Sequence, residues 1–151
     1  MKRVRVMSGH TDRIASIAWN NDIVCTGSRD KTILQRDPRS KGPFFSKLTH
    51  HKQEVCGLKW SPDGQQLCSG GNDNKLFVWN RTSNEPVVKY SDHVAAVKAV
   101  TWSPHQHGLL LSGGGTADKT IKFRNTLEGT TIKSIDTGSQ VCNLIFSKTL
   151  N

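Results

Sequence analysis

Apolar residues in this chain recur in short alternating runs that are separated by polar turns rich in glycine. The clearest run covers residues 75–79, and it follows the polar turn at residues 69–74. Alternation with a period of two is typical of β-strands, because successive side chains of a strand point to opposite faces of a sheet. The pattern therefore predicts short strands joined by tight turns.

The pattern also repeats at a nearly constant interval. Three histidines each precede a tryptophan by nine residues, and the pairs are 41 and 42 residues apart: His10 with Trp19, His51 with Trp60, and His93 with Trp102. Phe146 follows Trp102 by 44 residues, which indicates the start of a fourth copy. A repeat of about 40 to 45 residues with short strands is typical of the four-stranded blade of a β-propeller.

The repeats divide the chain into blades. Residues 8–48, 49–91 and 92–135 are predicted to be full four-stranded blades, with residues 1–7 as the outer strand of a preceding blade and residues 136–151 as the inner strand of the next. A generic β-sandwich is the alternative. Blades are favoured because one inner-strand position, where strands converge on a central channel, carries only small or short residues: Ser16, Gly57, Ala99 and Asn143.

The predicted fold is thus an all-β propeller segment whose ring is incomplete. Its open blade faces, and a bare edge at residues 141–146, are expected to expose apolar surface. Such a segment is expected either to be poorly soluble alone or to pair with another propeller fragment.

One set of polar residues in the second copy has a spacing that resembles WD40 repeats: His51, Ser69, Asp73 and Trp79. In that family the histidine bridges the aspartate and the serine, and the serine meets the indole N–H. The resemblance implies a structural tetrad, because a buried aspartate is stable only when its oxygens accept hydrogen bonds.

In copies one and three an arginine stands where the tryptophan is expected, Arg36 in one and Arg124 in the other. A guanidinium without a partner is unfavourable inside an apolar blade. We therefore expect incomplete networks in these copies, with both arginines turned outward to water. The other positions are kept, as His10, Thr26 and Asp30 and as His93, Ser112 and Asp118.

The net charge of +9 points to an acidic partner rather than to nucleic acid, because the 21 lysines and arginines are spread over all copies. A basic nucleic-acid-binding module is the less favoured alternative. No enzyme is expected, since the serine, histidine and aspartate of the tetrad lack a strand-to-helix nucleophile turn and the glycine runs precede strands rather than helices. No cofactor is expected either.

The four cysteines fall within strand patterns rather than in paired motifs: Cys25, Cys56, Cys68 and Cys142. They are predicted to be buried thiols rather than disulfides or zinc ligands. His105 and His107 lie in a turn without a third ligand, so no metal is expected there. No apolar run approaches the roughly 18 residues that cross a bilayer, and no signal peptide is seen, so we expect a soluble protein of the nucleus and cytoplasm.

Several loops resemble a more specific group, the Fizzy and Fizzy-related family of WD40 proteins. The similarity covers residues 8–147, and its motifs lie at residues 53–61, 69–74, 96–104, 113–118 and 138–144. The sequence His-Gln-His-Gly at residues 105–108 favours the Fizzy-related branch.

This resemblance implies a function and a site. Members of the family are coactivators of the anaphase-promoting complex, a ubiquitin ligase, and their seven-bladed propeller captures degrons of substrate proteins. The matching residues imply part of a receptor for the Lys-Glu-Asn degron: Asn72, Asn74, Thr116 and Gln140. Short amides and a hydroxyl on glycine-rich turns suit an extended peptide. The alternative is that Asn72 and Asn74 only shape their turn.

The chain also departs from the family pattern. Residues 149–151 read Thr-Leu-Asn instead of Ile-Arg, and we expect the N-terminal docking box for the ligase and the later blades to be absent. A second hypothesis is therefore a non-functional or regulatory truncated paralogue that acts only as a protein-interaction scaffold.

Overall fold

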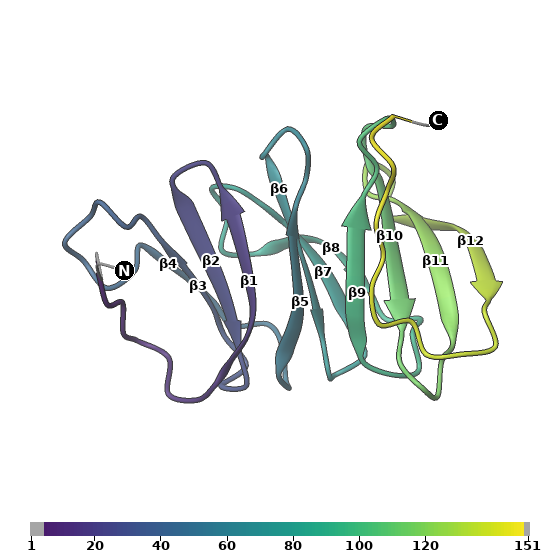
Figure 1. Cartoon of the computed structure of the whole chain (residues 1–151), viewed down its shortest axis with the longest axis horizontal. Coiled ribbons are helices and arrows are strands. Elements are labelled where there is room, and N and C mark those ends of the chain that lie inside the picture. The colour runs from purple at the N-terminus through teal and green to yellow at the C-terminus, as the bar shows by residue number, and fades with distance from the viewer. Residues whose placement is uncertain (1–4, 150–151) are drawn as a thin grey trace.

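The computed structural model describes residues 5–149, which contain twelve β-strands and no helix (Figure 1). The first sheet comprises β1 (Ile14–Asn20), β2 (Ile23–Ser28), β3 (Ile33–Arg36) and β4 (Ser46–Leu48). The second comprises β5 (Val55–Trp60), β6 (Gln66–Gly71), β7 (Leu76–Asn80) and β8 (Pro86–Tyr90). The third comprises β9 (Val97–Trp102), β10 (Leu109–Gly114), β11 (Thr120–Asn125) and β12 (Thr130–Asp136).

Each sheet is antiparallel and pairs its four strands in the order of the chain. The first strands β1, β5 and β9 lie next to one another, and the sheets stand in a row with β4 and β12 at opposite sides (Figure 1). This arrangement confirms the predicted all-β fold of three four-stranded blades in an open ring. Since residues 5–149 hold no helix, none of them forms a helix long and apolar enough to span a membrane.

The apolar core lies between the blades. One cluster joins the first and second blades and includes Ala18, Leu48 and Trp79, and a second joins the second and third blades and includes Val78 and Trp102. The strict alternation of the strands explains this, because one face of each sheet packs against the blade before it and the other against the blade after it.

Glycine is needed where neighbouring blades approach most closely. A Cβ added to Gly57 would lie 2.7 Å from the carbonyl oxygen of Lys98, and one added to Gly70 would lie even closer to the carbonyl oxygen of Val97. A backbone atom cannot move aside as a flexible side chain can. These two positions therefore set the distance between the second and third blades.

The predicted strands at both ends of the chain are not seen among residues 5–149. Residues 5–7 and 141–146 form no strand, and residues 1–4 lie outside the described part. Residues 141–146 instead pass beside the third blade: the Val141 N–H donates to the Gly114 carbonyl oxygen at 3.1 Å, and Cys142 and Asn143 share a cavity with Lys98 and Val100. The reason is that an inner strand pairs only with the second strand of its own sheet, and the described residues offer no such partner to this segment.

The cysteines match the prediction only in part. Cys25 and Cys68 are buried, Cys56 is half-buried and Cys142 is exposed, and all four are free thiols. Burial raises the pKa of Cys25 and Cys68 to about 12. The prediction that all are buried was wrong for Cys142, because no blade covers residues 141–146 on that side.

Candidate functional site

A buried polar network ties together the loops at one end of the second blade. His51 Nε2 lies 2.9 Å from Ser69 Oγ, and the indole N–H of Trp79 donates to the same oxygen at 2.9 Å. His51 Nδ1 lies 3.1 Å from the carboxylate of Asp73. The structure thus brings all four tetrad residues into one chain of contacts. Ser69 is fully buried, so its hydroxyl holds the fold together and is not presented to a substrate.

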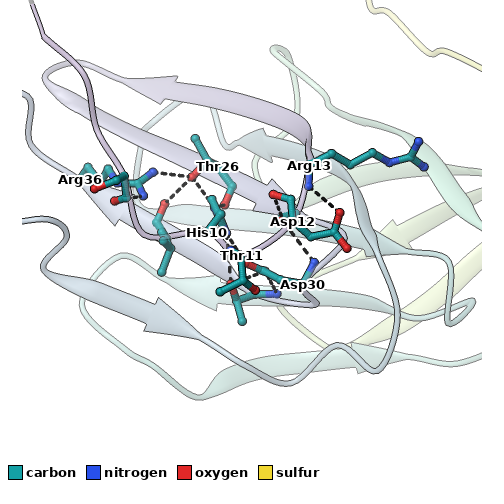
Figure 2. A network of polar contacts seen from close by, with 11 residues as sticks. His10, Thr11, Asp12, Arg13, Thr26, Asp30 and Arg36 are labelled. Atoms are coloured by element: carbon teal, nitrogen blue, oxygen red, sulfur yellow. Dashed lines mark hydrogen bonds and ion pairs between the residues drawn. The ribbon is translucent and has the colours of Figure 1, made fainter.

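The same network in the first blade contains an arginine instead of a tryptophan (Figure 2). His10 lies 2.8 Å from both Asp30 and Thr26, and Arg36 Nη1 donates to Thr26 Oγ1 at 3.0 Å. Arg36 also donates to two backbone carbonyl oxygens, those of Ser8 and Pro43. The prediction that Arg36 turns outward was wrong, because these carbonyls satisfy the guanidinium inside the blade.

The third blade repeats this substitution with a different set of partners. Arg124 is fully buried, and its Nε donates to Ser112 Oγ at 2.9 Å, where an indole would do so. Its Nη1 donates to Asp92 at 2.7 Å and to Thr131 at 2.8 Å, and the guanidinium lies 4.4 Å from the centre of the Tyr90 ring. The outward orientation predicted for Arg124 was therefore also wrong, since an ion pair and a stacking contact replace water.

The aspartates of these networks are held in their charged form. Burial alone would raise the pKa of Asp30, but hydrogen bonds from Thr32, the Thr11 backbone and His10 outweigh it and hold the pKa at about 2. Asp118 shows the same balance and also has a pKa of about 2. Each carboxylate therefore fixes the tight turn that follows the second strand of its blade.

These fixed turns form one end of the row of blades, which we call the tetrad end. It consists of the turns at residues 28–32, 71–75 and 114–119 and the loops that lead into β1, β5 and β9. Asn72 and Thr116 lie exposed on two of the turns, Gln140 lies exposed just before Val141, and Asn74 is half-buried. The tetrad end thus presents polar side chains on a rigid backbone.

The structure joins two of the predicted site residues directly. The hydroxyl of Thr116 donates to Oε1 of Gln140 at 3.2 Å. Asn72 instead meets a residue that the sequence did not single out, because its Nδ2 donates to Glu54 at 3.4 Å.

Asn74 has mainly a conformational role. Its φ is +64°, and the equivalent turn positions Lys31 and Lys119 have φ values of +73° and +59°. The backbone N–H of Asn74 donates to the carbonyl oxygen of Gly71. Asparagine tolerates the left-handed conformation better than most residues. For Asn74 the turn-shaping alternative is therefore supported, while its half-buried side chain still borders the tetrad end.

Two residues of the tetrad end were missed by the sequence reasoning. Arg13 Nε and Nη2 donate to Glu54 at 3.0 and 2.9 Å, and this ion pair joins the first and second blades. With Asn72 and Lys98 the pair lines a cavity of about 400 Å³. A signal was present, because opposite charges occupy the same repeat position, immediately before the first residue of the inner strand.

Comparison with known proteins places these observations in context. The WD domain, G-beta repeat family matches residues 1–37, 42–80 and 84–125. The Arabidopsis thaliana protein FIZZY-RELATED 2 is 61% identical over 150 residues, which is 99% of this chain and 31% of that protein. The Saccharomyces cerevisiae APC/C activator protein CDH1 is 49% identical, over 100% of this chain and 27% of its own length. The chain therefore spans less than a third of the length of these relatives.

A solved structure gives the same result for the fold. A chain in the crystal structure of the mitotic checkpoint complex matches with a TM-score of 0.96 and 43% sequence identity. The match covers 98% of this chain and 45% of that one.

Proposed function

Because this chain belongs to the WD domain, G-beta repeat family and matches Fizzy-related proteins along its whole length, we propose that it reads degron peptides for the anaphase-promoting complex. It would act as an adaptor that presents substrate proteins to this ubiquitin ligase. The names of two relatives support the partner, since they are an APC/C activator protein and an anaphase-promoting complex subunit.

One observation carries the proposal. Exposed Asn72 and Thr116 lie on turns of the tetrad end that buried aspartates hold in place, and the Thr116 hydroxyl donates to exposed Gln140. Amides and a hydroxyl can both donate and accept hydrogen bonds, so they suit the carboxylate and amide side chains of a Lys-Glu-Asn peptide. The rigid turns lower the entropic cost of binding an extended segment.

A calorimetric titration of a Lys-Glu-Asn peptide tests this function. We expect the chain to bind the peptide and Asn72→Ala to weaken binding by at least about tenfold, because a buried ligand amide loses its partner. Asn80→Ala is the matched control, since Asn80 is an exposed asparagine at the other end of the same blade. Equal binding by both variants, or no binding by the unmodified chain, would rule out degron reading at this site.

A second candidate function is a scaffold that pairs with another propeller fragment. Leu58 and Trp102 are buried where their blades meet the preceding blade, but the equivalent Ile17 and Trp19 of the first blade are 60% and 59% exposed. This open face has the shape and polarity of a blade interface. Co-purification with a separate propeller fragment tests the pairing, and recovery of the chain only as a monomer would exclude it.

A further inference from the structure

Glu54 holds Asn72 at two points. Its backbone carbonyl oxygen accepts the Asn72 N–H at 2.9 Å, and its side-chain Oε2 accepts Asn72 Nδ2–H at 3.4 Å. The Glu54 side chain is only 9% exposed, so its carboxylate does not swing freely into water. Asn72 therefore offers Nδ2 to the protein and keeps Oδ1 for another partner.

Arg13 in turn fixes the carboxylate of Glu54. Its Nε reaches one carboxylate oxygen at 3.0 Å and its Nη2 the other at 2.9 Å, which is the two-point geometry that orients a carboxylate most firmly. Arg13 points away from the tetrad of its own blade (Figure 2) and toward the second blade. Its side chain is 67% exposed, so the pair lies at the rim of the cavity that Asn72 also lines.

We propose that Arg13 and Glu54 are positioning residues that orient the Asn72 amide, so that its carbonyl oxygen faces the bound peptide. This inference rests on the proposed function and specifies the polarity of its site. At Asn72 the site accepts a hydrogen bond. At Gln140 it donates one, because the Thr116 hydroxyl orients the amide through Oε1 and, among the described residues, the amide N–H groups have no acceptor.

The polarity selects a class of ligand. A fitting peptide offers an N–H donor to Asn72 and a carboxylate or carbonyl oxygen to Gln140. A segment in which an acidic residue neighbours an amide residue meets both demands. Reversal of either amide would place two donors or two acceptors face to face, which costs binding.

The alternative role of Arg13 and Glu54 is only to join the first two blades. Other contacts already do so, because Ser16 Oγ donates to the Val55 carbonyl at 3.1 Å and Asn20 Nδ2 to the Gly64 carbonyl at 2.8 Å. An ion pair with an exposed arginine adds little to stability. A test must therefore distinguish whether Arg13 and Glu54 orient the Asn72 side chain or only hold the first two blades together.

The first measurement needs no ligand. In a ¹⁵N-labelled chain, the side-chain NH₂ signals of Asn72, assigned by their loss in Asn72→Ala, are expected to shift in Glu54→Gln and in Arg13→Leu. Glu85→Gln is the matched control, because Glu85 is an exposed glutamate of the same blade that pairs with His50 instead. Unchanged Asn72 signals in Glu54→Gln would overturn the proposal, whether or not any peptide binds.

The second measurement uses the Lys-Glu-Asn peptide. Glu54→Gln is expected to weaken binding about tenfold, with Glu85→Gln unchanged. The exchanged pair Arg13→Glu with Glu54→Arg keeps an ion pair between the blades but leaves no carboxylate at position 54 to accept from the Asn72 side chain. We expect it to keep the melting temperature of the unmodified chain but to bind the peptide as weakly as Glu54→Gln. Recovery of the affinity would contradict the positioning role, whereas loss of peptide binding in the unmodified chain would contradict the proposed function alone.

Discussion

An arginine can occupy the place of a tryptophan inside a blade only if its additional donors find acceptors. An indole has one N–H, which the hydroxyl of the second strand accepts, whereas a guanidinium has five. Arg36 uses backbone carbonyls for the excess, and Arg124 uses Asp92 and Thr131. Among the described residues, Nη2 of Arg124 is still buried without a partner. The third blade therefore carries a buried guanidinium whose charge is paired with Asp92 but whose Nη2 donors lack an acceptor.

This imbalance predicts opposite effects for two substitutions of Arg124. Arg124→Met removes the guanidinium that donates to Ser112 and Asp92, and we expect it to lower the free energy of unfolding by about 3 kcal/mol. Arg124→Trp supplies the indole N–H and removes the charge. We expect its free energy of unfolding to equal that of the unmodified chain or to be about 1 kcal/mol higher. Urea unfolding measures both. A tryptophan variant less stable than the methionine variant would show that the guanidinium fits the site better than an indole.

The tetrads also predict how stability depends on pH. Burial lowers the pKa of His93 from 6.5 despite its contact with Asp118. Below about pH 6.5 the unfolded chain therefore binds a proton at His93 more readily than the folded chain, and the fold loses stability. Asp30 and Asp118 have pKa values lowered from 3.8 to about 2, so they stabilise the fold above pH 3.8 and lose this contribution as the pH falls to about 2. The histidine and the aspartates thus both make the fold less stable as the pH falls.

We therefore expect the melting temperature to fall in two stages, first below about pH 6.5 and then more steeply between about pH 4 and 2. Scanning calorimetry across this range checks the order. His93→Gln is expected to remove the first stage and keep the second. A melting temperature that rises between pH 7 and 5 would be inconsistent with a neutral buried His93.

At the scale of the strand, packing between blades depends on the absence of a Cβ atom at Gly70. We expect Gly70→Ala to lower the free energy of unfolding by more than about 2 kcal/mol, because the added Cβ would meet the carbonyl oxygen of Val97. Gly42→Ala is the control, since its Cβ would have only Ser40 Oγ nearby, at 3.8 Å. Thermal unfolding compares the two variants. An equal loss of stability in both would mean that the blades can move apart to accept the added Cβ at residue 70.

Strands and turns were largely predictable because their signal is local. Alternation and the histidine–tryptophan interval define β5 to β7 closely, and the resemblance to WD40 repeats implies the polar tetrad of the second blade. The missing end strands were not predictable from alternation, because a strand at residues 141–146 also needs a hydrogen-bonding neighbour. Local patterns do not contain that information.

The candidate site was less predictable for a similar reason. The orientation of Arg36 depends on the carbonyl oxygens of Ser8 and Pro43, and these are backbone atoms, whose positions a pattern of side chains does not reveal. The ion pair of Arg13 with Glu54 joins residues 41 positions apart in different blades. Repeat spacing locates equivalent residues, but it does not show which side chains of adjacent copies touch.

At the scale of the whole molecule, the open face of the first blade should govern association. Ile17 and Trp19 are exposed there, so we expect concentration-dependent self-association that the double substitution Ile17→Ser and Trp19→Ser reduces. Folding stability should change little, because neither side chain is buried in the single chain. Sedimentation velocity measures the association. If the double variant self-associates as strongly as the unmodified chain, the interface lies on another surface.

Each sheet completes its backbone ladders among its own four strands, so neighbouring blades share side-chain packing but no ladder. One blade can consequently open while the next keeps its amides protected from solvent exchange. The third blade is the natural starting point, because every residue of its last strand is solvent-accessible. The protein should then unfold in successive cooperative steps, one four-stranded sheet at a time, rather than in a single transition.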